Sequence, residues 1–188
     1  MLILEPPIRA AVLTVSDRCS KGITTDTSGP ALCEMLRTKL GAKIVRTGIL
    51  PDETDQLAAC FVEWSRVVGE TAAPDLILST GGTGLAPRDV TPEAAARVIQ
   101  RPHAGLMDLA RMRCFAKTPR TFLSRGIAGT INQTLLITLP GSPRGATEML
   151  EALLDILPHA VETLRGDVQD DGRPGAAATT GRVVRHED

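Results

Sequence analysis

The sequence predicts a single α/β domain, a three-layer α/β/α arrangement around a mostly parallel central sheet. Short apolar segments rich in β-branched residues alternate with longer amphipathic segments along most of the chain, a pattern that favours a sheet covered by helices on both faces. The chain has 188 residues, of which 43% are hydrophobic, enough for one domain with a sizeable core. Only 2% are aromatic, so we expect an aliphatic core.

Four segments are expected to be strands, because each is short, apolar and bounded by turn-forming residues. The segment over residues 121–130 is compatible with a loop or with a short strand, and its pattern does not distinguish the two. The four expected strands are residues 9–16, 43–50, 76–80 and 134–139.

Helices are expected between these strands, where apolar residues recur every three or four positions. Gly41 is expected to end the first helix, and Val68 is the last apolar position of the second. Thr91 suits an N-cap, Pro92 the first helical position, and Glu93 complements the positive end of the helix dipole. The expected helices are residues 28–40, 51–68, 92–99, 103–114 and one last helix opened by the turn 140–143.

The domain is expected to span residues 1–165, followed at 166–188 by a polar tail with few large apolar residues, which we expect to be disordered. The first residues lack a basic segment followed by a long apolar one, which argues against a secretory signal and against a membrane span. We therefore expect a soluble, cytoplasmic protein. The net charge of −1 and the scarcity of aromatics argue against nucleic-acid binding.

Three strand ends carry polar or glycine-rich loops, at residues 14–17, 80–84 and 139–143. The carboxyl ends of parallel strands meet at one rim of a sheet, where ligands bind in open α/β folds. Glycines there let backbone N–H groups approach an anion closely, which predicts a ligand containing phosphate. Two common phosphate motifs are absent: no lysine follows Gly84 as a P-loop requires, and Pro87 occupies the last position of a GxGxxG fingerprint.

Two carboxylates are expected at the same rim, because Asp52 follows the second strand and Asp89 follows the glycine loop. Mg²⁺ is typically held by one or two carboxylates together with phosphate oxygens, so the pair is a candidate magnesium site. Asp52 also suits a helix N-cap and Asp89 a turn. Arg88 and Arg125 are candidate phosphate ligands, although lone arginines are usually solvated.

These residues resemble the molybdopterin-binding family, which includes molybdopterin adenylyltransferases and a domain of gephyrin. The resemblance keeps order and spacing over about residues 8–164. The segments that carry it are LTVSDRCSKGITTDTSGP (13–30), LPDE (50–53), LILSTGGTGLAPRDVTPEA (76–94), LSRGIAG (123–129) and LLITLPGSPRGATEML (135–150).

The resemblance implies an enzyme of molybdenum cofactor biosynthesis that uses Mg²⁺ and ATP to adenylate the terminal phosphate of molybdopterin, releasing pyrophosphate. It implies that Asp52 and Asp89 are catalytic and hold Mg²⁺. It also implies a homotrimer that passes its product to a molybdenum-insertion protein. The implied residues that bind substrate or nucleotide are Ser16, Asp17, Thr80, Gly81, Gly82, Thr83, Gly84, Ser124, Arg125, Pro140, Gly141 and Ser142.

The sequence departs from the family pattern in the segment after residue 94, where Ala104 and Asp108 replace a proline and a glutamate. Three alternative functions remain open. The first is a paralogue or carrier that binds molybdopterin without catalysis, the second a scaffold module, and the third a nucleotide-binding regulator.

Overall fold

The computed structural model describes residues 4–68 and 72–166. Its centre is a six-stranded sheet in the order β2-β1-β3-β6-β5-β4. The first four strands run parallel, and β5 and β4 continue the sheet antiparallel to their neighbours. The mostly parallel sheet is therefore confirmed. The strands are β1 (Arg9–Val15), β2 (Lys43–Leu50), β3 (Leu76–Thr80), β4 (Arg101–Pro102), β5 (Ala128–Ile131) and β6 (Thr134–Leu139).

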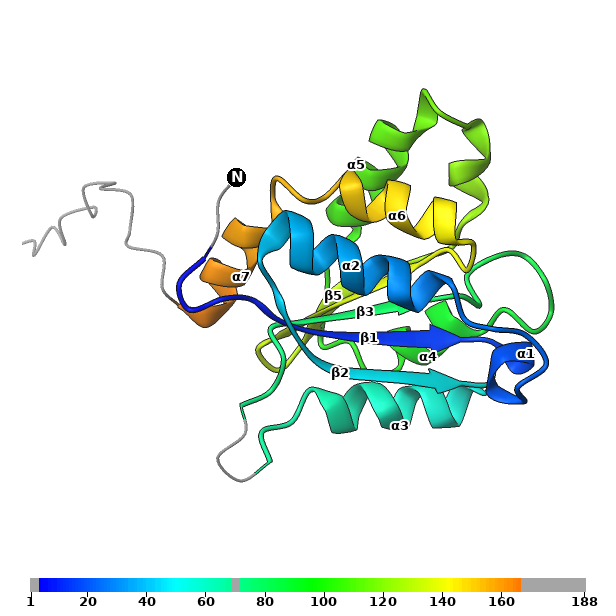
Figure 1. The fold of residues 1–188 in the computed structure, drawn as a ribbon, viewed down its shortest axis with the longest axis horizontal. Coiled ribbons are helices and arrows are strands. Elements are labelled where there is room, and N and C mark those ends of the chain that lie inside the picture. The colour runs from blue at the N-terminus through cyan, green and yellow to red at the C-terminus, as the bar shows by residue number, and fades with distance from the viewer. Residues whose placement is uncertain (1–3, 69–71, 167–188) are drawn as a thin grey trace, which may run out of the picture.

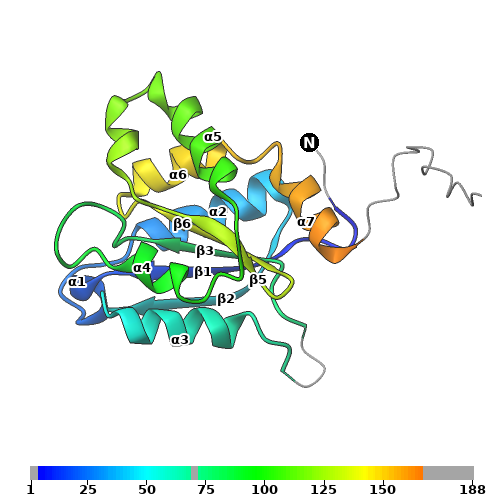
Figure 2. The same cartoon turned by 180° about the vertical axis from the view of Figure 1, so that it is seen from behind.

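Helices cover both faces of the sheet, which confirms the three layers (Figures 1 and 2). One buried aliphatic cluster joins the sheet to α2, α5, α6 and α7, and a second cluster joins the other face to α3 and α4. The helices are α1 (Asp17–Ser20), α2 (Ser28–Leu40), α3 (Thr54–Trp64), α4 (Thr91–Ala96), α5 (Ala104–Phe115), α6 (Pro143–Glu151), α7 (Leu157–Arg165) and the 3₁₀ helix η1 (Pro119–Leu123).

Strand β1 shows why these segments are strands. Successive side chains of a strand point to opposite faces of a sheet. Ala10 and Val12 pack into the cluster beneath α2, and Ala11 and Leu13 pack into the cluster beneath α3. Because both faces are covered, the strand is apolar throughout rather than alternating with polar residues.

Several predicted boundaries were wrong. Residues 17–27 are not entirely loop, because α1 forms where the Ser16 hydroxyl accepts a hydrogen bond from Cys19 N. Helix α3 ends at Trp64, and Val68 lies beyond it with 56% of its surface exposed. Helix α4 ends at Ala96, and Thr91 is not its N-cap.

The expected single C-terminal helix is two helices, α6 and α7, separated by residues 152–156. Pro158 lies in the first turn of α7, where a missing N–H costs nothing, whereas in the middle of one long helix it would remove a hydrogen bond. The undecided segment 121–130 contains the end of η1 and the start of β5. The two-residue strand β4 was not predicted.

The expected disordered tail lies outside the described residues from position 167 onward. Across residues 4–68 and 72–166, no helix combines the length and the hydropathy needed to cross a bilayer.

The end of the sheet opposite the rim is closed by an ion pair between Asp75 and Arg165, both of whose side chains are 16% exposed. The Asp75 carboxylate accepts from Arg165 Nη2 at 2.7 Å and from Arg165 Nε at 3.0 Å. It also accepts from the backbone N–H of Arg9 at 2.7 Å. One carboxylate therefore joins the last described helix to the start of the first strand.

We expect Asp75→Ala to lower the free energy of unfolding by about 2 kcal/mol, because it leaves a guanidinium and a backbone N–H without their largely buried partner. The control is Asp55→Ala, which removes a carboxylate that is 95% exposed and paired with Arg97. The control should cost less than about 1 kcal/mol. Urea unfolding measures both, and equal losses would contradict the assignment.

Candidate functional site

Two adjoining cavities open at the rim where β1, β2, β3 and β6 end. The large cavity has a volume of about 430 Å³ and the polar cavity about 280 Å³. Gly82, Asp89 and Gly141 line both, so the two are continuous. The predicted site residues that line one or both cavities are Ser16, Asp52, Gly81, Gly82, Thr83, Gly84, Asp89, Ser124, Pro140, Gly141 and Ser142.

The glycine loop follows β3 in a conformation that other residues rarely adopt. Gly81 has φ +110° and Gly82 has φ +61°. A Cβ on Gly81 would overlap the carbonyl oxygen of Val15, and a Cβ on Gly82 would overlap the Thr91 hydroxyl. The loop is fixed by three hydrogen bonds: Gly81 N donates to Leu139 O, Thr91 Oγ1 donates to Gly81 O, and Thr91 N donates to Gly82 O. Thr91 thus anchors the loop instead of capping α4 with its side chain.

Asp52 lines the polar cavity at the end of β2. Its Oδ2 accepts from Asp17 N at 3.0 Å, and Asp52 N donates to Asp17 Oδ1 at 3.2 Å. This exchange joins the loops after β1 and β2. Burial raises the pKa of the Asp52 carboxyl, and the negative charges of Asp17 and Asp89 raise it further. A cation bound beside Asp52 would therefore stabilise its ionised form.

Asp89 lies where the two cavities meet. Its Oδ2 accepts from Ala86 N at 2.8 Å, and its own N–H donates to Ala86 O, so residues 86–89 form a turn that orients the carboxylate. Its Oδ1 has no protein hydrogen-bond partner in the described part of the chain. The oxygen is free to meet a ligand at the junction.

Four residues that the sequence suggested as ligand contacts, Asp17, Thr80, Arg88 and Arg125, line neither cavity and instead hold the loops in place. Arg88 binds Asp17 through two nitrogens and Glu53 through one, and this pairing lowers the pKa of the Asp17 carboxyl. Thr80 Oγ1 donates to Pro140 O at 2.7 Å. These contacts fix the rim rather than contribute to its lining.

Arg125 makes the most extensive of these loop contacts. Its Nε donates to Gly84 O at 2.7 Å, its Nη2 donates to Asp89 O, and its Nη1 pairs with Glu93. The guanidinium therefore joins the two ends of the segment 84–89 to the first turn of α4. A loop carrying a candidate catalytic carboxylate is braced by an arginine expected to bind ligand.

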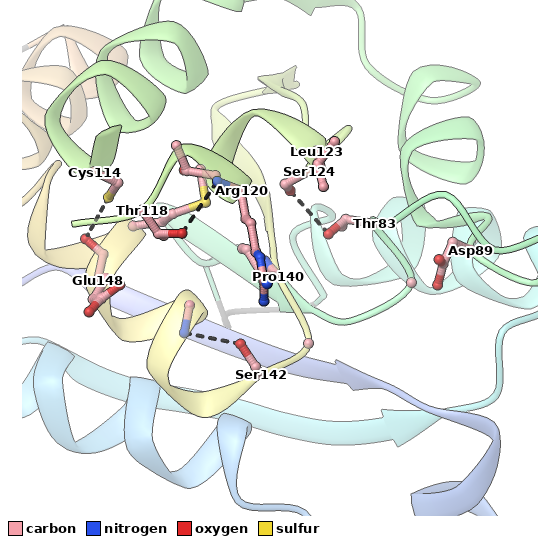
Figure 3. A pocket seen from close by; sticks show the side chains of 16 residues that line it. Thr83, Asp89, Cys114, Thr118, Arg120, Leu123, Ser124, Pro140, Ser142 and Glu148 are labelled. Carbon is pink, nitrogen blue, oxygen red and sulfur yellow. Dashed lines mark hydrogen bonds between the residues drawn. The ribbon is translucent and has the colours of Figure 1, made fainter. Parts of the chain in front are cut away.

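Several lining residues were not identified from the sequence. Asp26 accepts from Thr14 Oγ1 and from the backbone N–H groups of Ser28 and Gly29, so it fixes the start of α2 beside the polar cavity. An acidic residue just before a predicted helix start is a capping signal that could have identified Asp26. Arg120 and Glu148 line the large cavity, and Figure 3 shows Arg120 extended from η1 toward Pro140 and Ser142. No sequence signal marked Arg120, because its segment had no clear pattern.

The walls of the two cavities differ in chemistry. The large cavity has an apolar part, which includes Leu123 and Met149 and suits a ring system, and a polar part with Arg120 and Ser142. The polar cavity is formed by backbone and short polar side chains and suits phosphates. Helix α6 begins beside both, with Ser142 as N-cap accepting from Gly145 N at 3.1 Å. The positive end of its dipole favours an anion there.

The carboxylates fit Mg²⁺ as an ion shared with a ligand. Asp52 and Asp89 line one cavity, and the residues described contain no group of three or more His, Cys, Asp or Glu side chains that would hold a metal without help. Mg²⁺ usually takes one or two carboxylates and completes its shell with substrate phosphates and water. The donor set matches that use better than a closed structural metal site.

Comparison with known proteins agrees with this arrangement. The family described as "Probable molybdopterin binding domain" matches residues 11–159. Molybdopterin adenylyltransferase of Helicobacter pylori is 38% identical over 161 residues, which cover 85% of this chain and 89% of that protein. The chain covers only 21% of gephyrin of Dictyostelium discoideum, with 37% identity over 159 residues and 80% of this chain covered.

Solved structures give the same result. The molybdopterin biosynthesis enzyme MoaB of Thermus thermophilus has a TM-score of 0.77 and 42% identity, covering 85% of this chain and 97% of that one. A structure of MogA has a TM-score of 0.75 and 34% identity, covering 83% and 99%. The fold, the lined rim and these matches lead to one conclusion: the chain belongs to the molybdopterin-binding domain family of molybdenum cofactor biosynthesis.

Proposed function

We propose that the protein transfers AMP from Mg-ATP to the terminal phosphate of molybdopterin and releases pyrophosphate. The observation that carries the proposal is that Asp52 and Asp89 line one cavity together with the backbone of Gly81 and Gly82. Curated relatives called molybdopterin adenylyltransferase include the Escherichia coli protein, 30% identical over 193 residues, covering 96% of this chain and 97% of that one. Carboxylates and glycine amides are the parts that phosphoryl and nucleotidyl transfer require.

The reaction needs alignment more than covalent chemistry from the protein. A terminal phosphate oxygen of molybdopterin attacks the α-phosphorus of ATP. The new O–P bond forms as the bond from that phosphorus to the bridging oxygen breaks, and pyrophosphate leaves with the electron pair. Because both reactants are anions, the reaction is accelerated mainly by holding them in a fixed geometry and by neutralising their charge. The continuous pair of cavities offers such an arrangement.

The chain's own groups divide this work. In the glycine loop, the backbone N–H groups beyond Gly81, whose own N–H donates to Leu139 O, would orient phosphate oxygens, and the positive end of the α6 dipole would favour them. Asp52 and Asp89 would hold Mg²⁺, which supplies positive charge to the transferring phosphates. Arg88 and Arg125 keep both carboxylate-bearing loops in place by the hydrogen bonds already described. The apolar wall of the large cavity excludes water from a bound ring.

A second candidate function is molybdopterin binding without transfer. The specific observation in its favour is that the matching family is described by molybdopterin binding alone, and the 42% identical MoaB structure by molybdopterin biosynthesis without a named transfer. The two candidates differ in one measurable outcome, which is the formation of adenylylated molybdopterin with pyrophosphate.

The assembly and cellular setting are part of the same proposal. We place the protein in the cytoplasm as a homotrimer that passes its product to a molybdenum-insertion protein. Light scattering of the purified chain tests the trimer directly.

The decisive experiment mixes purified protein, molybdopterin and Mg-ATP, and follows adenylylated pterin by chromatography and pyrophosphate by a coupled assay. We expect product that depends on Mg²⁺ and falls at least about 100-fold in Asp89→Asn, because the neutral amide loses a ligand charge at the junction. Asp155→Asn is the control, since Asp155 pairs with Arg113 outside both cavities. Tight pterin binding by the wild-type protein without product would favour the second candidate.

We also expect Asp52→Asn to be inactive yet more stable than the wild-type protein at pH 7 without Mg²⁺. The pKa of Asp52 is raised by burial, so its ionised form opposes folding, and that cost grows as pH rises through the folded-state pKa. The gain in unfolding temperature should disappear as pH falls below the unfolded-state pKa of about 3.9.

Asp155→Asn supplies a control of opposite sign for this stability experiment. Hydrogen bonding to Arg113 lowers the pKa of Asp155, so its ionised form favours folding at neutral pH and that benefit is lost on acidification. Its substitution should therefore not raise the unfolding temperature at pH 7. A stability gain in both variants would show that the effect of Asp52→Asn does not come from its buried charge.

A further inference from the structure

The lining of the two cavities carries an imbalance of charge. Its acidic members are Asp26, Asp52, Asp89 and Glu148. Among the described residues that line either cavity, the one basic side chain is Arg120. A ligand with phosphates would add further negative charge to a wall that is already acidic. The cation at position 120 is therefore the one protein charge available to oppose it directly.

Three other arginines near the rim, Arg88, Arg125 and Arg111, already have partners. Arg88 is taken by two carboxylates, and Arg125 by two carbonyl oxygens and Glu93. Arg111 donates to Ser124 O and to Gly126 O, the latter at 2.6 Å. Redirecting any of them to a ligand would break contacts that hold the loops. The N–H groups of these three side chains therefore stabilise the fold and are not available to a ligand.

Arg120 differs from these three. Its guanidinium makes no hydrogen bond or ion pair with any of residues 4–68 and 72–166, although its backbone N–H donates to Thr118 Oγ1 at 3.3 Å. The backbone contact fixes the start of η1. The side chain extends across the large cavity toward Pro140 and Ser142, as Figure 3 shows. Arg120 is exposed, so water solvates its guanidinium, and it can turn to a ligand in the cavity without breaking a contact that holds the fold.

The surroundings of Arg120 favour an anion. Across the cavity from it lies Ser142, the N-cap of α6, and this nine-residue helix presents its positive end there. Guanidinium and helix dipole together would enclose a phosphate from two sides.

We propose that Arg120 binds a phosphate group of the ligand in the large cavity, opposite the N-terminus of α6. The proposal rests on the proposed function for the choice of ligands, which are Mg-ATP and molybdopterin. Both carry phosphate, and the structure assigns the contact to phosphate chemistry. Arg120 acts in binding, so its loss should raise KM much more than it lowers kcat.

The test measures equilibrium binding of Mg-ATP and of molybdopterin separately, by calorimetry, to Arg120→Gln and to the wild-type protein. A charge-assisted hydrogen bond is worth about 1.5–3 kcal/mol, so affinity for one of the two ligands should fall about 10- to 100-fold. The ligand whose affinity falls is the one whose phosphate contacts Arg120. Arg120→Lys should restore part of the affinity, because it keeps the charge and loses the planar fork.

Arg66→Gln is the matched control. Arg66 is exposed, lies just beyond α3 and lines neither cavity, so its substitution removes the same charge without touching the site. The wild-type affinity should also weaken with added salt more steeply than that of Arg120→Gln. Circular dichroism and thermal unfolding confirm that each variant is folded.

Unchanged affinity of Arg120→Gln for both ligands would overturn the inference, and so would an equal loss in Arg66→Gln. The readout is binding and does not depend on turnover. A wild-type protein that binds both ligands but forms no product would refute adenylyl transfer and leave the Arg120 assignment standing. Product formation by the wild-type protein, with no effect of Arg120→Gln on binding, would support adenylyl transfer and refute the Arg120 assignment.

Discussion

The rim depends on how closely the glycine loop approaches the ends of its neighbouring strands. Gly81 packs against the carbonyl of Val15, and its N–H donates to Leu139 O. Gly82 sits against the Thr91 hydroxyl and beside the Asp52 carboxylate. This contact sets where α4 begins and places the Asp52 carboxylate at the polar cavity. A side chain at either glycine would separate the parts that have to meet.

Around that contact, charged side chains take two different roles. Three arginines donate hydrogen bonds to carbonyls and carboxylates of the chain and so fix its loops and the ends of the described chain. They are Arg88, Arg125 and Arg165. Asp52 and Asp89 remain directed at the cavities, where burial and mutual repulsion disfavour the charge of Asp52. The hydrogen bonds that Asp52 exchanges with Asp17 hold its unfavourable charge in place. Such a division is expected where stability is given up locally for ligand binding.

Much of the fold was predictable from the sequence, because buried parallel strands are apolar throughout and glycines or prolines bound them. Strand β6 is one example. The pattern failed where tertiary contacts decide: β4 is too short to show a period, and the division between α6 and α7 lies within a continuous apolar face. The candidate site was predictable to the extent that its residues sit in the loops after strands. The sequence could not show that the donors of Arg125 are used by Gly84 O, Asp89 O and Glu93, because these contacts exist only in the folded chain. It did not mark Arg120 as a lining residue, because the segment around it has no clear pattern.

The two-residue strand β4 also limits how the sheet can grow. It forms one edge of the sheet, and one of its two residues is Pro102, which has no N–H to offer a further strand. Exposed edges are where sheets of separate molecules join, and a short edge interrupted by proline is a poor template for that pairing. On this side the sheet therefore offers a second copy of the chain little backbone to pair with, which opposes edge-to-edge aggregation.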